Sequence, residues 1–182
     1  MQGVNTNYDT DLFTPIHEHM RGLLGHDPET FESERFSYQV IADHSRAVTF
    51  LIADDVLPSN EGRGYVLRRI LRRAVRHGRL LGRREPFMAE ASAVVIEVMG
   101  TAYPHLVDRR TEILATIARE ETQFARTLDA GTGQLEAALR ALTDADRVVG
   151  RRPEELPVDV PRVAGDLAFK LHDTYGFPID LT

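Results

Sequence analysis

Cysteine is absent from this 182-residue sequence, so disulfide bonds and thiolate metal sites are excluded. No apolar run approaches the roughly 18 residues that a membrane-spanning helix needs. The N-terminal residues MQGVNTNYDTD contain neither a basic stretch nor an apolar core, so we expect no secretory signal. Together these absences predict a cytoplasmic protein that does not enter a membrane.

Motifs for catalysis and metal binding are also missing. The sequence has no G-K-[ST] of a phosphate-binding loop and no H-E-x-x-H zinc motif. Its seven histidines share no metal-ligand spacing. Asp43 and His44 are adjacent, but no nucleophile accompanies them, so a polar contact on a helix is the better interpretation. We therefore predict no catalytic residue and no metal ligand in this chain.

The charged residues are unevenly distributed. The net charge is −6, which by itself argues against nucleic-acid binding. Residues 63–84, however, hold nine arginines and no acidic residue, whereas all 28 acidic residues lie elsewhere. A basic segment on an otherwise acidic chain is typical of a site for a polyanion. Hydrophobic residues make up 42% of the chain, which is enough for a folded core around this segment.

Apolar residues recur at helical spacing along most of the chain, and no alternating pattern predicts a strand. We therefore expect a mainly α protein. Loops are expected for the HDPET sequence at 26–30 and for 143–165, which is rich in proline, glycine and charge. The predicted helices cover residues 9–24, 34–55, 64–81, 87–99, 108–142 (as one helix or two) and 166–173.

Helical spacing also predicts which side chains are buried. Leu12 and Phe36 fall on the apolar stripes of their helices, so both are expected in the core. Glu120 and Glu121 fall among the charged residues of the long helix 108–142. We expect both to face solvent and to pair with nearby arginines of the same helix.

The predicted helix 64–81 has one apolar and one basic side. With about 100° between successive residues, its apolar residues, Val66 among them, span one half of the helix and its arginines the other. We interpret the basic half as a surface for the phosphates of a nucleic acid. The alternative is a solvated helix face, although such faces usually mix both charge signs and this one has no acids.

The PSNEGRG sequence at 58–64 leads into this helix. Serine and asparagine suit a cap or a turn, and the glycines permit a close backbone approach. A functional loop and an ordinary loop that leads into a helix are equally consistent with this spacing.

Four stretches of the chain resemble alanyl-tRNA synthetases. They are NYDTDLFTPI at 7–16, the block IADHSRAVTFLIADDVLPSNEGRGYVLRRILRRAVRHGRLLG at 41–82, EETQFARTL at 120–128, and FKLHDTYGFPIDLT at 169–182. They bracket nearly the whole chain in the family's order, and the 41–82 block is long and unusual in composition. Residues 143–165 look like a lineage-specific insertion, and Ser45 stands where the family pattern has a bulkier apolar residue.

The resemblance implies a fragment of a class II aminoacyl-tRNA synthetase, which activates alanine with ATP and attaches it to the 3′ end of tRNA-Ala. It implies that the ATP, Mg²⁺ and alanine site precedes this segment and that the editing domain with its zinc follows it. The isolated chain is then expected to be inactive and to hold no cofactor. Residues 1–30 would be the end of the catalytic domain, and residues 31–182 a helical, bundle-like tRNA-recognition domain. The expected partners are the acceptor stem of tRNA-Ala and the remaining domains of the synthetase.

The resemblance also implies that this domain reads a G·U pair in the acceptor stem. A wobble pair leaves the guanine amino group unpaired in the wide, shallow minor groove of A-form RNA. A carboxylate accepts from an amino group, and an amide both donates and accepts. On this basis the resemblance implies that Asn60 in PSNEGRG and Asp173 in HDTYGFP contact the base pair. The contacts to the RNA backbone are expected from Arg63, Arg68, Arg69, Arg72, Arg73 and Arg76.

Two other function classes remain open at this point. The chain could be a non-catalytic helical module that uses the arginine-rich helix against an acidic protein or as a general RNA clamp. Binding to a protein partner with indifference to tRNA would favour that module. An intact small enzyme is the third and weaker alternative, which any ATP-dependent turnover by these 182 residues would favour.

Overall fold

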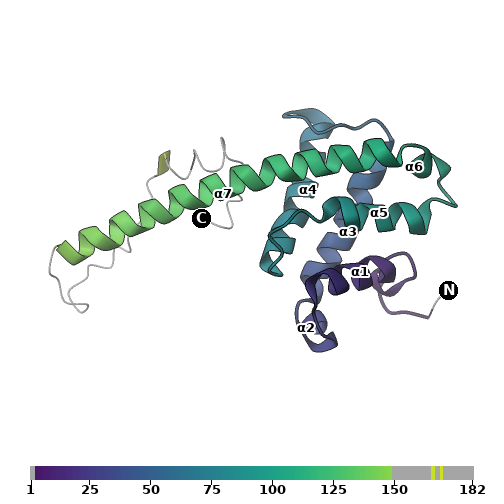
Figure 1. The fold of residues 1–182 in the computed structure, drawn as a ribbon, viewed down its shortest axis with the longest axis horizontal. Coiled ribbons are helices and arrows are strands. Elements are labelled where there is room, and N and C mark those ends of the chain that lie inside the picture. The colour runs from purple at the N-terminus through teal and green to yellow at the C-terminus, as the bar shows by residue number, and fades with distance from the viewer. Residues whose placement is uncertain (1–2, 149–164, 167–168, 170–182) are drawn as a thin grey trace. The chain divides into compact units, whose positions relative to one another are not determined.

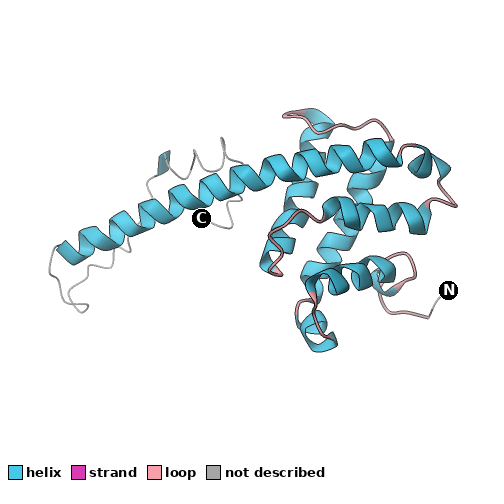
Figure 2. Ribbon diagram, viewed as in Figure 1, coloured by secondary structure: helices cyan, strands magenta, loops and turns pink. Residues whose placement is uncertain are grey.

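The structure is a computed structural model, and it describes residues 3–148, 165, 166 and 169. The chain divides into two compact units, Met1–Thr122 and Gln123–Thr182. All regular structure in the described residues is helical (Figure 2), so the predicted mainly α class is confirmed. The elements are η1 (Asn7–Asp9), α1 (Thr14–Leu24), α2 (Pro28–Ser33), α3 (Arg35–Ala53), α4 (Gly62–Leu80), α5 (Met88–Met99), α6 (Pro104–Asp108) and α7 (Arg110–Val148).

Helix α3 is the centre of the first unit (Figure 1), with α1, α2, α4, α5 and α6 packed against it. Its side chains Ile41, Val48 and Ile52 are fully buried, as are Leu67 and Leu71 on the facing side of α4. Removing such side chains from water is the main force that holds amphipathic helices together. Helix α1 packs on α3 and α5, so the N-terminal residues join this helical core. The domain boundary expected at residue 30 stays a prediction.

The HDPET sequence, expected to be a loop, begins helix α2. The side chain of Asp27 accepts a hydrogen bond from the backbone N–H of Thr30 at 2.8 Å, and Pro28 occupies the first helical position. An aspartate cap followed by proline is a helix-start signal, because proline has no N–H to leave unsatisfied there. The loop prediction was therefore wrong from residue 28 onward.

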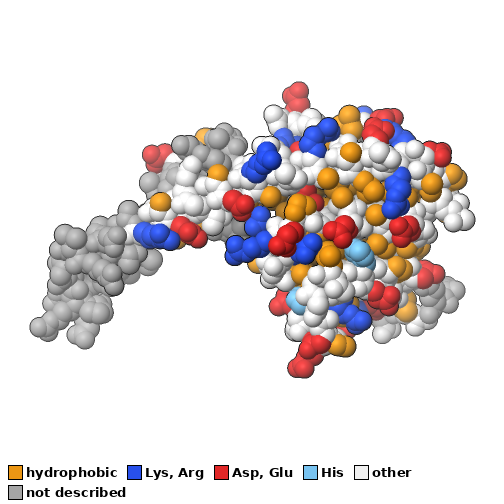
Figure 3. Space-filling view, viewed as in Figure 1, with side chains coloured by type: hydrophobic (Ala, Val, Ile, Leu, Met, Phe, Trp, Pro, Cys, Tyr) orange, Lys and Arg blue, Asp and Glu red, His pale blue; other side chains and the backbone are white. Residues whose placement is uncertain are grey.

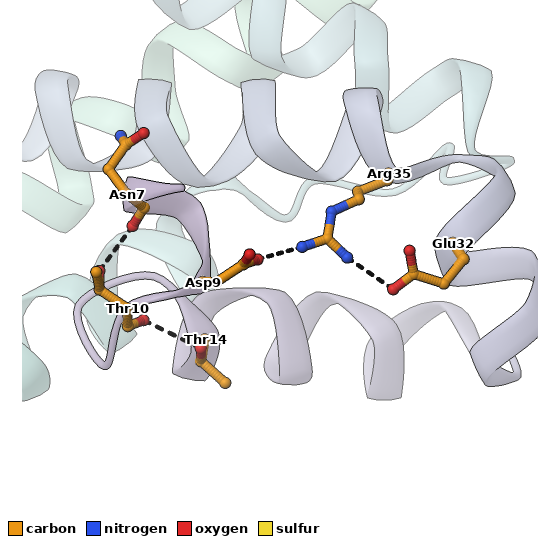
Figure 4. A network of polar contacts seen from close by, with 6 residues as sticks. All are labelled: Asn7, Asp9, Thr10, Thr14, Glu32 and Arg35. Atoms are coloured by element: carbon orange, nitrogen blue, oxygen red, sulfur yellow. Dashed lines mark hydrogen bonds and ion pairs between the residues drawn. The ribbon is translucent and has the colours of Figure 1, made fainter. Parts of the chain in front are cut away.

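The segment before α1 is fastened to the start of α3 through polar contacts (Figure 4). The Arg35 guanidinium bonds to Asp9 and, at 2.6 Å, to Glu32. The Thr14 hydroxyl donates to the carbonyl of Thr10 at 3.0 Å. Because α1 begins only at Thr14, Leu12 precedes the helix and is 41% exposed, so its predicted burial was wrong.

Two side chains of α3, Phe36 and Ser45, differ in burial from what their residue types suggest. Phe36, predicted to be in the core, lies in the first turn of α3 and is 63% exposed, with its ring edge against His77 at 5.5 Å between centroids. Ser45 is fully buried, and its hydroxyl donates to the carbonyl of Ala42. A small hydroxyl residue fits this core position because the preceding helical turn satisfies it.

In the second unit, α7 continues as one helix to Val148. Phe124 and Leu128 are buried, as their place on the apolar stripe predicted. Residues 143–148, expected to begin a loop, are helical, while nearly all of 149–165 and most of the predicted helix 166–173 lie outside the described residues. None of the helices in the described part of the chain combines the length and the apolar character that crossing a bilayer requires.

Candidate nucleic-acid interface

Helix α4 carries the arginines and is anchored by its opposite side. Leu67, Leu71 and Ala74 are fully buried, and α4 packs mainly against α3. Gly78 continues this buried side, where the ring of Phe87 occupies the space that a Cβ would need. Val66, predicted on the apolar half, is 53% exposed instead. The buried side is thus centred on Leu67, Leu71, Ala74 and Gly78 rather than on the whole apolar half.

The six predicted arginines divide on α4 into an exposed set and a half-buried row. Arg63, Arg69 and Arg73 are exposed, whereas Arg68, Arg72 and Arg76 are half-buried. The guanidinium of Arg69 lies 5.9 Å from the ring centroid of Tyr65 one turn earlier, a cation–π contact that restricts its motion. In place of the expected uniform strip, α4 therefore carries an exposed set of arginines beside one half-buried row.

Glu120 of α7 holds two arginines of the half-buried row, Arg68 and Arg72. Its Oε1 lies 2.7 Å from Nε of Arg68 and 3.5 Å from a terminal nitrogen of Arg72. Burial, reinforced by the charge of Arg68, lowers the pKa of the Arg72 guanidinium, and Glu120 opposes that shift. The Glu120 side chain is only 12% exposed, so its predicted place on the solvent face was wrong. Arg68 and Arg72 share one carboxylate, which weakens their attraction for a distant phosphate.

Asn60 lies in the exposed loop just before α4 and bonds through Oδ1 to the guanidinium of Arg68. The loop is tied to the helix start, because the Ser59 hydroxyl donates to the carbonyl of Glu61 at 2.7 Å. It also lies directly on Gly64, where a Cβ would collide with the backbone of Leu57 and Ser59. Gly64, in the first turn of α4, therefore permits the close approach of the loop backbone.

Asp173, the other predicted base-pair residue, lies outside the described residues. The structure thus brings Asn60 together with Arg68 and places Arg63, Arg69 and Arg73 along the adjoining helix. Contacts of these residues with RNA stay predictions. Within the described residues, no group of three or more His, Asp or Glu side chains is arranged to hold a metal ion.

Sequence reasoning missed the two acidic residues that organise this part of the fold. Glu120 pairs with the arginines of α4, and its neighbour Glu121 is 2% exposed and accepts hydrogen bonds from the backbone N–H groups of Phe87 and Met88, each at 3.0 Å. The sequence did contain one indication of this pairing. The basic helix has no acidic residue of its own, so a carboxylate that neutralises its arginines has to come from another helix. Acidic and basic side chains are indeed interspersed on the face of the molecule in Figure 3.

Comparison with known proteins supplies the family. A family model described as tRNA synthetases class II (A) matches residues 1–182. Alanine–tRNA ligases are similar over the whole chain: those of Roseiflexus castenholzii and Roseiflexus sp. (strain RS-1) are each 50% identical, and that of Anaeromyxobacter dehalogenans is 47% identical. The alignments cover 19%, 19% and 20% of these relatives, so the chain spans about a fifth of their length. A match of this strength along every part of the sequence shows that the chain belongs to the alanyl-tRNA synthetase family of class II aminoacyl-tRNA synthetases.

Proposed function

We propose that this chain is the part of an alanine–tRNA ligase that binds the acceptor stem of tRNA-Ala and reads its G·U pair. The observation that carries the proposal is the exposed set of arginines on α4: Arg69 and Arg73 lie one turn apart, and Arg63 lies in the first turn beside the loop that presents Asn60. Exposed arginines on one helix suit the phosphates of an RNA backbone, and an amide in the adjoining loop suits a base edge.

The arginines and the amide have different tasks in this proposal. Arg63, Arg69 and Arg73 contact phosphates and set the register of the RNA stem, without selecting a sequence. Asn60 and Asp173 contact the G·U pair from the minor groove and supply the selectivity. The proposal extends to the whole ligase as follows: ATP, Mg²⁺ and alanine bind in the catalytic domain and zinc in the editing domain. The present chain is then expected to hold no catalytic residue and to be inactive alone.

The base-pair contact is tested with two RNA minihelices that differ only in a G·U or a G·C pair. We expect the unaltered chain to bind the G·U duplex more tightly, and Asp173→Ala or Asn60→Ala to remove a preference worth roughly 1–3 kcal/mol. Fluorescence anisotropy titrations measure both affinities. Equal affinity of the unaltered chain for the two duplexes contradicts the proposal, and indifference to RNA with tight binding of an acidic protein would favour a protein-binding module.

The phosphate contact is tested by neutralising Arg69 and Arg73, the exposed pair one turn apart on α4. Replacing Arg69 and Arg73 by glutamine should weaken both duplexes alike and reduce the slope of log affinity against log salt by about 1 for each phosphate that is no longer bound. Arg110→Gln is the matched control, because Arg110 pairs with Glu97 at 3.2 Å and lies on another helix. A salt slope that stays the same in the double variant would show that these arginines do not meet phosphates.

A further inference from the structure

Arg68 connects the loop before α4 with helix α7. One terminal nitrogen of its guanidinium bonds to Asn60, while its Nε donates to Oε1 of Glu120 at 2.7 Å. The Arg68 and Glu120 side chains are 20% and 12% exposed, so their ion pair is largely shielded from water. A shielded, charge-assisted hydrogen bond is stronger and better oriented than an exposed one. Arg68 is thereby held in one direction by α7.

This contact decides which end of the Asn60 amide faces outward. A guanidinium group has five N–H donors and no acceptor, so only the amide oxygen of Asn60 can meet Arg68. With Oδ1 engaged, Nδ2 and its two N–H groups are the part of the amide that remains for a ligand. Asn60 is exposed, so these donors are accessible at the surface.

We propose that Arg68 and Glu120 are positioning residues that present Asn60 to RNA as a hydrogen-bond donor. The proposal rests on the function proposed above and adds the chemistry of the contact. An outward N–H group bonds to an acceptor in the minor groove, namely the pyrimidine O2, whose position differs between a wobble pair and a Watson–Crick pair. It does not bond to the guanine amino group, which is itself a donor and is left to the Asp173 carboxylate.

The loop geometry explains why a positioning pair is effective here. The backbone of Leu57 and Ser59 lies directly against Gly64, and Ser59 is hydrogen bonded to Glu61, so the backbone around Asn60 is already restricted. The remaining freedom is the rotation of the Asn60 side chain, and the bond to Arg68 removes it. Fixing this rotation before binding spares the RNA complex the entropy of ordering the amide.

The first test needs no RNA. In the full chain, Glu120→Ala should shift and broaden the side-chain NH₂ signals of Asn60 in a ¹⁵N-correlated NMR spectrum, because Arg68 loses its anchor. Glu112→Ala is the matched control, since Glu112 on the same helix pairs with Arg109 at 3.0 Å. Asn60 signals that are the same in the unaltered chain and in Glu120→Ala overturn the positioning role, whatever the RNA measurements show.

The second test measures affinity for the G·U and G·C minihelices. Glu120→Ala should lower the ratio of the two affinities roughly three- to tenfold, and double substitution with Asn60→Ala should add nothing further. Overall affinity should not fall, because the substitution removes a negative charge beside the RNA; a variant that had merely lost its fold would bind both duplexes poorly. The control Glu112→Ala should keep the ratio of the unaltered chain.

Asn60→Asp tests the direction of the amide. A carboxylate keeps the bond to Arg68 but offers no donor, so the preference for G·U should fall as far as in Asn60→Ala. A preference that Asn60→Asp retains or strengthens would show that Asn60 accepts a bond from RNA, and the proposed orientation would be overturned. If the unaltered chain prefers neither duplex, the proposed function fails, and the NMR test still decides whether Arg68 and Glu120 position Asn60.

Discussion

Replacing Glu121 by alanine will destabilise the unit Met1–Thr122 by about 2–4 kcal/mol. The Glu121 carboxylate is buried and accepts the backbone N–H groups of Phe87 and Met88, which are the N-cap and first residue of α5. The first N–H groups of a helix have no partner within the helix. Alanine leaves two of these donors buried without an acceptor, and it removes a negative charge from the positive end of the helix dipole.

Urea unfolding monitored by circular dichroism measures this loss. Glu121→Gln should cost less, because the amide oxygen can still accept one of the two bonds. Glu97→Gln on α5 is the matched control: its partner Arg110 lies 3.2 Å away in an exposed ion pair, which contributes at most about 1 kcal/mol. A loss below about 1 kcal/mol in Glu121→Ala would show that the carboxylate does not cap α5.

The second large predicted effect is a loss of stability at acidic pH that is caused by His17. His17 in α1 is 5% exposed, and its Nε2 has no hydrogen-bond partner among the described residues. Burial, assisted by the charge of Arg35 and opposed by Asp9, lowers the pKa of His17 from 6.5 to about 4. The unfolded chain therefore takes up a proton at a higher pH than the folded one does. Stability is complete above the unfolded pKa of 6.5 and falls as the pH drops toward 4, by about 3 kcal/mol in all.

A series of urea unfolding curves between pH 7 and pH 4 measures this dependence. The difference in unfolding free energy between the unaltered chain and His17→Gln should shrink by about 3 kcal/mol across that range, because glutamine does not titrate. Glu121 contributes to the pH dependence with the opposite sign. Burial raises the pKa of its carboxyl above 4.5, so the stability that comes from this shift is present below pH 4.5 and is lost as the pH rises. Glu121→Gln removes the contribution of Glu121 and so separates it from that of His17. If the unfolding free energies of His17→Gln and the unaltered chain changed in parallel with pH, the assignment to His17 would be contradicted.

Periodicity was enough to place most helices of this chain. The helix predicted at 64–81 is observed as Gly62–Leu80, and the one predicted at 87–99 as Met88–Met99. These helices are amphipathic, so a local pattern reports both their type and their buried side. Short elements such as α2 (Pro28–Ser33) depend on a cap and a few bonds, and a search for apolar stripes passes over them.

Contacts between residues far apart in the sequence could not be predicted from the pattern of each helix taken alone. A helical wheel treats α4 as if it were alone in water, so it predicts that the arginines of its basic half are equivalent. The structure divides them because Glu120, which lies 52 residues after Arg68, approaches one side of the helix. The same holds for Glu121, whose burial depends on where α7 crosses the start of α5. Contacts of this kind are set by tertiary packing, which local patterns do not encode.

Site-directed cross-linking tests most directly whether the outward side of α4 meets an RNA stem. Val66 on α4 and Val107 on α6 are each 53% exposed, so the two positions are matched in residue type and accessibility. A photoreactive p-benzoylphenylalanine at position 66 should cross-link to the acceptor stem of tRNA-Ala, while the same group at position 107 should give little or no product. Equal cross-linking from both positions, or cross-linking from position 107 alone, would contradict the account.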